Sequence, residues 1–266
     1  MPGMQRKDVL GMAQTIAVAG KGGTGKTTLT GFLIDYLVKQ GCDSILAVDA
    51  DANDNLNEVL GVEVEFTLGQ IREEVANAER DENSPIPKGM NKQDYMEFRL
   101  NSALAEGDDF DLLVMGRTQG TGCYCYANSL LKSQLQKITK NYDYIIVDNE
   151  AGMEHISRGT LPEIDKIILV SDCSRRGVQA VARIAELVDE LGLKPKMMKL
   201  IINRAPSTEL DPAVREEVEK HGLDLLGVVP HDDMVYEYDA AGKPTSTLPS
   251  DAPSRRAFEQ LVKGII

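Results

Sequence analysis

The sequence is poor in cysteine and in basic residues. Only 4 of its 266 residues are cysteine, which is too few for a disulfide framework in a chain of this length and favours metal binding or catalysis for any close pair. Lys and Arg total 29 against 42 Asp and Glu, and the resulting net charge of -13 repels nucleic-acid backbones and anionic lipids. We therefore expect no nucleic-acid partner and no membrane partner.

Long hydrophobic runs are also absent. No apolar stretch approaches the roughly 20 residues that a membrane-spanning helix needs. The first residues, MPGMQRKDVLGMA, lack the long apolar segment of a secretory signal. These absences predict a cytoplasmic protein, in which residues 1–13 are a loose extension of a domain that covers 14–266.

Short apolar runs do occur, and they alternate with helical patterns. They lie at 15–20, 44–50, 111–116, 142–149, 166–171, 198–203 and 225–230. Helical patterns fit at 26–40, 91–106, 126–140, 176–192, 211–221 and 253–264. Runs that are apolar on both faces are typical of parallel strands with helices on each side. The pattern predicts a single α/β domain whose mostly parallel central sheet has about seven or eight strands, flanked by helices on both faces.

One polar stretch interrupts this alternation. Residues 78–94, AERDENSPIPKGMNKQD, are charged and contain Pro85, Pro87 and Gly89. Because these residues break regular structure, we interpret the stretch as an insertion loop within the domain.

A phosphate-binding motif lies between the first predicted strand and the first predicted helix. The segment VAGKGGTGKTT at 18–28 contains the pattern G-x-x-x-x-G-K-T. Its backbone N–H groups can surround phosphate oxygens, Lys26 can reach the terminal phosphates, and the Thr27 hydroxyl can ligate Mg²⁺. The predicted binding residues are Gly20, Lys21, Gly22, Gly23, Thr24, Gly25, Lys26, Thr27 and Thr28. The chain is therefore predicted to be a P-loop NTPase that binds ATP or ADP with Mg²⁺.

The lysine after the first glycine, Lys21, is not part of the ordinary motif. With it, the loop resembles that of the MinD/ParA/nitrogenase-iron-protein group of P-loop ATPases. In that group this lysine crosses a dimer interface to the nucleotide of the partner. The resemblance implies a homodimer in which Lys21 is catalytic, because a cation supplied by the partner offsets charge on the transferring phosphoryl group. A solvated loop lysine is the alternative.

Two further strand ends carry carboxylates. Asp49 and Asp51 lie at the end of the predicted strand at 44–50, and Asp148 lies at the end of the strand at 142–149. Such carboxylates suit Mg²⁺ and its waters, and a positioned carboxylate can orient an attacking water. By resemblance, Asp51 is the catalytic residue that positions this water, and the N–H of Gly152 senses the γ-phosphate. Strand termination or helix capping is the alternative for each carboxylate.

The predicted adenine contacts are Asn203, at the end of the strand 198–203, and Pro230, at the end of the last predicted strand. Related ATPases read the base at these positions, with an Asn side chain and the loop backbone. A buried asparagine that satisfies a loop backbone is the alternative for Asn203.

Cys123 and Cys125 lie in the glycine-rich segment QGTGCYCYANSLL, directly before the predicted helix at 126–140. One intervening residue disfavours a disulfide between them, whereas thiolates at a helix N-terminus suit a soft metal. Nickel or zinc in a thiolate site takes four ligands, so two chains related by a two-fold axis could complete it. Two unrelated thiols in a turn are the alternative.

Taken together, the segments GKGGTGKTT, VDADAN, GCYCYANSLL and DNEAGMEHISRGT resemble the CooC type of ATPase. The resemblance implies an ATP-dependent homodimer that binds one Ni²⁺, or Zn²⁺, between its subunits. It also implies a client nickel enzyme, either carbon monoxide dehydrogenase or acetyl-CoA synthase, that receives the metal during maturation.

Two other functions remain open at this stage. One is an iron–sulfur reductase like the nitrogenase iron protein, although that group takes its cluster cysteines from two separate loops. The other is a positioning ATPase of the MinD or ParA kind, which the acidic composition and the cysteine pair disfavour.

Overall fold

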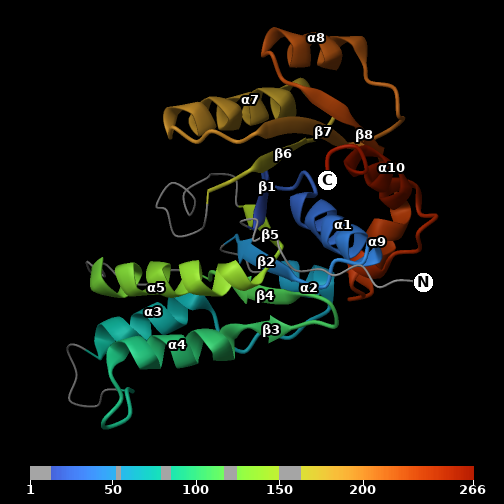
Figure 1. Ribbon diagram of the computed structural model, residues 1–266. Coiled ribbons are helices and arrows are strands. Elements are labelled where there is room, and N and C mark those ends of the chain that lie inside the picture. The colour runs from blue at the N-terminus through green and yellow to red at the C-terminus, as the bar shows by residue number, and fades with distance from the viewer. Residues whose placement is uncertain (1–12, 52–54, 79–84, 117–124, 150–162) are drawn as a thin grey trace, which may run out of the picture.

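A computed structural model describes residues 13–51, 55–78, 85–116, 125–149 and 163–266, without the side chains of residues 125 and 126. Its centre is an eight-stranded sheet in the order β3-β4-β2-β5-β1-β6-β7-β8 (Figure 1). The strands are β1 (Gln14–Gly20), β2 (Ile45–Ala50), β3 (Ala105–Glu106), β4 (Asp111–Val114), β5 (Tyr144–Asn149), β6 (Lys166–Ser171), β7 (Met197–Ala205) and β8 (Leu225–Pro230). Every neighbouring pair is parallel except β3 with β4. The predicted fold class is therefore confirmed.

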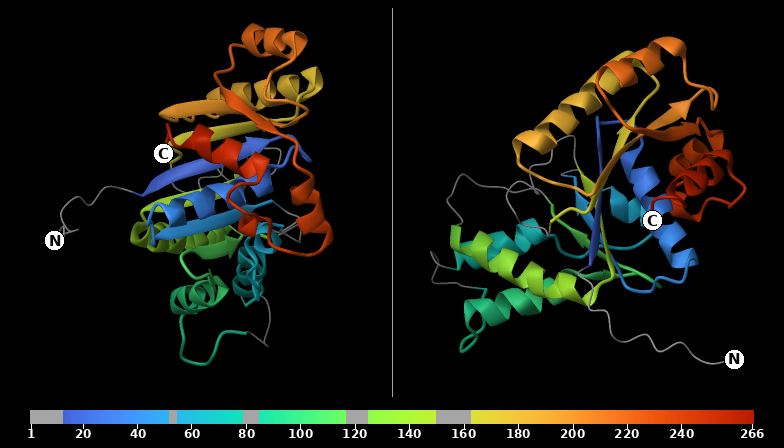
Figure 2. Two further views of the ribbon diagram at one scale, coloured as in Figure 1. Left: turned by 90° about the vertical axis from the view of Figure 1, so that its right-hand side faces the viewer. Right: turned by 45° about the horizontal axis from the view of Figure 1, so that its top comes forward.

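Helices cover both faces of the sheet (Figures 1 and 2). One face carries α3 (Leu68–Asn77), α4 (Lys92–Ala103), α5 (Cys125–Ile138), α7 (Arg175–Glu190) and α8 (Pro212–Lys220). The other carries α1 (Lys26–Lys39), α2 (Leu56–Leu60), α9 (Asp233–Ala240) and α10 (Pro253–Val262). Short 3₁₀ turns, η1 (Thr139–Asn141) and η2 (Thr245–Thr247), complete the described elements.

The central strands separate two hydrophobic cores. Along β1, Ile16 and Val18 join the core under α1 and α10, while Ala17 and Ala19 join the core under α5 and α7. This alternation follows from the two-residue period of a strand. Because both faces are buried, the strand has to be apolar throughout, as the sequence indicated.

The C-terminal helix α10 is part of the core. The Phe258 ring is 1 % exposed, and its centroid lies 6.1 Å from that of Phe32 on α1. Among the described residues, no helix is long and apolar enough to cross a membrane.

The predicted helix at 91–106 was too long. Helix α4 ends at Ala103, and Ala105 and Glu106 pair antiparallel with Leu112 and Asp111 of β4. The Gly107 N–H donates to Phe110 O at 2.8 Å and closes the turn between the two strands. This pairing is a tertiary contact that outweighs local helical preference.

Helices α2, α3 and α9 were not predicted. A signal for α3 was present, because Thr67 and Gln70 form a capping box with both reciprocal hydrogen bonds. At the N-terminus, Ala13 packs partly buried against the core. Residues 1–12 lie outside the described residues.

Within the predicted insertion 78–94, residues 85–91 form no helix or strand, but Lys92 already begins α4 after the N-cap Asn91. Residues 79–84 lie outside the described residues, so that part of the insertion stays a prediction.

Candidate nucleotide-binding site

The predicted phosphate loop joins the centre of the sheet to a buried helix. Strand β1 ends at Gly20 and α1 begins at Lys26. Gly23 and Gly25 adopt left-handed backbone angles, with φ of 79° and 88°. A Cβ at Gly25 would lie only 2.4 Å from Nδ2 of Asn203. Both the backbone angle and the close approach therefore require glycine at position 25.

Bonds within the loop hold its first turn. The Thr24 hydroxyl donates to the carbonyl oxygen of Lys21 at 2.9 Å, and Lys26 Nζ donates to the same oxygen at 3.4 Å. Thr24 and Lys26 are buried, whereas Lys21 itself is exposed. The loop is thus folded with Lys26 turned back across it and with Lys21 at the surface.

The end of β7 holds the same loop from outside. Asn203 Nδ2 donates to Thr24 O at 2.9 Å, and an Nη1 of Arg204 donates to Gly23 O at 3.0 Å. Arg204 has a φ of 57°, the only positive value among the described non-glycine residues. Since such a backbone is costly for a residue with a Cβ, these contacts must maintain it. The side-chain nitrogen of Asn203 therefore bonds to the loop backbone. This is the arrangement that the sequence analysis gave as the alternative to an adenine contact.

Two buried carboxylates lie side by side next to the loop. Asp49 of β2 and Asp148 of β5 are register partners, and they are 0 % and 1 % exposed. The backbone N–H groups of Asp51 and Leu56 donate to Asp49 at 3.0 and 2.9 Å. Asp148 Oδ1 accepts from the Thr30 hydroxyl at 3.3 Å, and its Oδ2 is buried without a hydrogen-bond partner among the described residues.

The pKa of Asp148 reflects this environment. Burial raises it from 3.8 to about 7, and the charge of Asp49 adds to the rise, while Thr27, Lys26 and Thr30 oppose it. A carboxylate in this state can recover its lost solvation by holding a cation or the waters around one. The unpartnered Oδ2 therefore fits Mg²⁺, with the Thr27 hydroxyl as a ligand and Asp49, Asp51 and Asp148 as holders of its waters.

A cavity of about 840 Å³ opens above the loop. Its lining includes six of the predicted phosphate-binding residues and the predicted catalytic residue Asp51. These six are Gly22, Gly23, Gly25, Lys26, Thr27 and Thr28. The structure thus brings the phosphate loop and Asp51 to one space.

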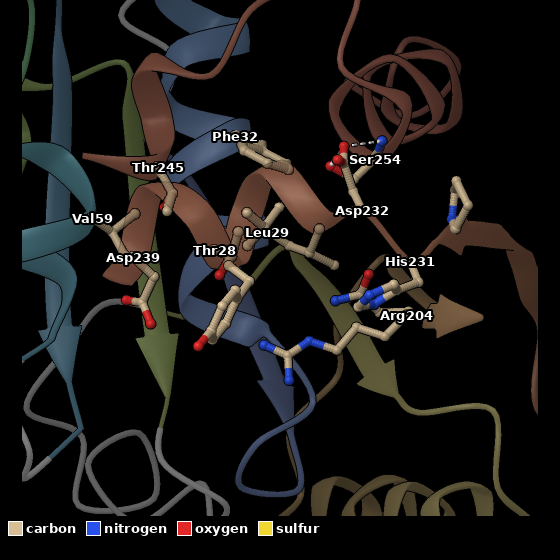
Figure 3. Close-up of a pocket in the computed structure, with 14 residues that line it drawn as sticks. Thr28, Leu29, Phe32, Val59, Arg204, His231, Asp232, Asp239, Thr245 and Ser254 are labelled. Carbon is tan, nitrogen blue, oxygen red and sulfur yellow. Dashed lines mark hydrogen bonds between the residues drawn. The ribbon is translucent and has the colours of Figure 1, made fainter. Parts of the chain in front are cut away.

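A second cavity of about 250 Å³ adjoins the first, and the two share Thr28, Arg204 and Asp239 among their lining residues. It is lined by both predicted adenine residues, Asn203 and Pro230. Figure 3 shows Arg204 entering from β7 and Asp239 from α9. A nucleotide whose phosphates bind the loop can therefore extend into this side cavity.

Most lining residues of the smaller cavity were not predicted, among them Arg204, Tyr236, Asp239 and Thr245. Arg204 directly follows Asn203, so its place in the sequence was a usable signal. No local signal marks Tyr236, Asp239 and Thr245, because η2 reaches the cavity through packing against α1 and α2, and α9 through packing against the core on the same face of the sheet. The Thr245 hydroxyl is buried without a hydrogen-bond partner among the described residues, so it could bond to a ligand in the cavity.

Two predicted residues, Cys123 and Gly152, lie outside the described residues. Cys125 is the first residue of α5, so the predicted helix at 126–140 starts one residue earlier and ends at Ile138. In the described part of the chain, no group of three or more His, Cys, Asp or Glu side chains is arranged to hold a metal ion.

Known proteins resemble this chain in sequence and in fold. Residues 13–201, more than half of the chain, match the family described as AAA domain. An uncharacterized ATP-binding protein of Methanocaldococcus jannaschii is 42 % identical over 252 residues, which are 94 % of this chain and 98 % of that protein. The carbon monoxide dehydrogenase accessory protein CooC of Rhodospirillum rubrum is 31 % identical over 239 residues, which are 85 % of this chain and 87 % of that protein.

Among solved structures, the septum site-determining protein MinD of Pyrococcus horikoshii, complexed with Mg-ADP, has a TM-score of 0.67 at 22 % identity. The likeness covers 96 % of each chain and concerns the fold alone. Together with the family match and the phosphate loop at the centre of the sheet, these similarities show that the chain belongs to the AAA domain family, as a P-loop ATP-binding protein with the fold of MinD.

Proposed function

We propose that the protein is an ATP-dependent metallochaperone. It acts as a nucleotide-controlled homodimer that binds Ni²⁺, or Zn²⁺ in its place, through Cys123 and Cys125 and delivers it to carbon monoxide dehydrogenase or acetyl-CoA synthase. The similarity to CooC supports this function.

The observation that carries the proposal is topological. Strand β4, which precedes the cysteine segment, is parallel to β2, and β2 is parallel to β5 and β5 to β1. Because the carboxyl ends of parallel strands meet at one edge, the chain leaves β4 at Val114 on the same edge where β1 enters the phosphate loop. The phosphate loop and the segment that contains the cysteines thus both begin at the same edge of the sheet.

Metal binding would follow from thiolate chemistry at this edge. Cys125 opens α5, and the positive end of a helix lowers the pKa of a nearby thiol. Each chain supplies two thiolates, whereas a tetrahedral site needs four. A two-fold axis through the segment would complete the site, so metal binding would depend on pairing of two chains.

ATP hydrolysis would control that pairing. Lys26 binds the terminal phosphates, and Asp51 orients a water that attacks the γ-phosphorus. The bond between the γ-phosphorus and the oxygen that bridges it to the β-phosphorus breaks, which yields ADP and phosphate. When bound, Mg²⁺ supplies charge neutralisation on the phosphate oxygens. Lys21, exposed at the loop, supplies the second cation to the partner's nucleotide. Hydrolysis removes these contacts and relaxes the closed dimer.

Metal content and mass test this function together. We expect wild-type protein with ATP to bind about half a Ni²⁺ per chain and only in the dimer, because each site takes two ligands from each chain. The double substitution Cys123→Ser/Cys125→Ser should lose the nickel, whereas Cys42→Ser, at a cysteine packed against the core under α1, should keep it. One nickel per monomer that survives the double substitution would contradict the proposal.

A further inference from the structure

We propose that Tyr236 and Arg204 form the two sides of a slot that holds the base of the nucleotide by stacking. This assignment rests on the ATP-binding part of the proposed function and adds two residues that recognise the base.

Tyr236 is conspicuous by its exposure. Its side chain is 72 % exposed, the highest value among the described large hydrophobic residues. The same residue nevertheless lines the smaller cavity, together with Asn203 and Pro230. A ring that lines a cavity and is mostly exposed leaves surface for a ligand, and a planar base suits stacking on an aromatic ring.

Arg204 offers a second surface in the same cavity. Its guanidinium is planar and stacks well on aromatic rings. The irregular pairing of β7 with β8 between Ile202 and Ala205, and the positive φ of 57°, turn this residue out of the strand toward the phosphate loop. Its bond to Gly23 O at 3.0 Å then ties the proposed base slot to the loop that would bind the phosphates.

The polar groups around the slot suit a nucleoside. Asp239 lies three residues after Tyr236 on α9 and lines both cavities, so its carboxylate can accept from ribose hydroxyls between base and phosphates. The buried Thr245 hydroxyl lacks a partner among the described residues and lines both cavities as well. These groups would not be needed by a ligand that consists of phosphate alone.

The absence of tryptophan from the chain allows a direct test. The variant Tyr236→Trp carries one tryptophan, whose fluorescence a stacked base quenches. We expect quenching by ATP and by ADP, and no change with tripolyphosphate, which has the phosphates and no base. Phe98→Trp on α4 is the matched control, because Phe98 is 59 % exposed and does not line either cavity.

Affinity gives a second readout. Tyr236→Ala should weaken ATP binding about tenfold or more, the loss expected for one base–aromatic stack, and leave tripolyphosphate binding unchanged. Tyr236→Phe, which keeps the ring, should restore the wild-type dissociation constant in calorimetry.

The results separate this inference from the function on which it rests. If wild-type protein binds ATP but Tyr236→Trp shows no quenching, or tripolyphosphate quenches equally, the base slot is wrong and ATP binding stands. An unaltered ATP affinity in Tyr236→Ala would likewise overturn it. If wild-type protein binds no ATP at all, the proposed function itself fails.

Discussion

At the scale of single residues, the site is defined by groups that the fold leaves unsatisfied. Asp148 is the clearest case, because it is buried beside Asp49 and one of its oxygens has no partner in the described part of the chain. Keeping such a carboxyl in the core costs stability whenever it is ionised. A residue that lowers stability and faces a phosphate loop is best explained by what it binds.

The raised pKa of Asp148 predicts a pH dependence of stability. Below the ordinary value of 3.8 the carboxyl is protonated in both states, and between 3.8 and about 7 only the unfolded chain releases the proton. The free energy of unfolding of ligand-free protein should therefore fall as the pH rises through this window. The change is on the order of 4 kcal/mol at most. Urea unfolding at several pH values measures it.

The variant Asp148→Asn isolates this contribution. It keeps a hydrogen-bonding oxygen for Thr30 and cannot ionise, so its stability should exceed that of wild type above pH 7 and match it near pH 4. Its Mg²⁺-dependent ATP hydrolysis should be lost. A constant stability difference between the two proteins across this range would show that Asp148 is ionised throughout.

At the scale of elements, α9 forms a wall of the site and is anchored by one residue. Asp232 Oδ1 accepts from the Met234 N–H at 3.1 Å and so caps α9. Its Oδ2 accepts from the N–H and the hydroxyl of Ser254, at 3.0 and 2.8 Å, at the start of α10 (Figure 3). One buried carboxylate thus fixes two helices relative to each other.

Removing this anchor should affect both stability and binding. We expect Asp232→Ala to lower the free energy of unfolding by about 2 kcal/mol, through a lost cap and unpaired buried donors. It should also weaken ATP binding, since Tyr236 and Asp239 move with α9. Ser254→Ala, which removes only one of the bonds, should cost about 1 kcal/mol and leave ATP affinity nearly unchanged. An Asp232→Ala protein that loses stability but binds ATP normally would contradict a role for α9 in the site.

Elements could be predicted from the sequence where local chemistry decides them. The strands of the sheet centre and the phosphate loop were predicted because a buried parallel strand must be apolar and a phosphate turn must contain glycine. Strand β3 was missed because two residues adopt a strand only by pairing with β4. Helix α9 was missed although Asp232 offered a capping signal before it.

The candidate site follows the same division. Lys26, Thr27, Asp49 and Asp148 could be predicted as site residues because they lie at the ends of strands or at the start of a helix in a known order around the phosphate loop, and their roles stay predictions. The positions of Arg204 and Tyr236 could not be predicted from the neighbouring sequence. The position of Arg204 depends on a positive φ at the end of β7, and that of Tyr236 on how α9 packs against the core under α1. Both are consequences of tertiary structure.

At the scale of the whole molecule, the proposed function requires two copies of the chain. The Lys21 side chain is exposed at the edge where the nucleotide would bind, and the Cys125 that opens α5 belongs to a segment leaving the same edge. In our account, a second copy of the chain completes both the charge around the phosphates and the thiolate set around the metal. Pairing of two copies is therefore the central claim.

The most direct measurement of this claim is complementation between two inactive variants. Lys21→Ala lacks the cation for its partner, and Asp51→Ala lacks the residue that positions water, so we expect each alone to hydrolyse ATP about 100-fold more slowly than wild type. In an equimolar mixture, about half of the dimers are mixed, and one of their two sites has both groups. The mixture should then recover about a quarter of the wild-type rate. A mixture no more active than its components, or a fully active Lys21→Ala, would contradict the account.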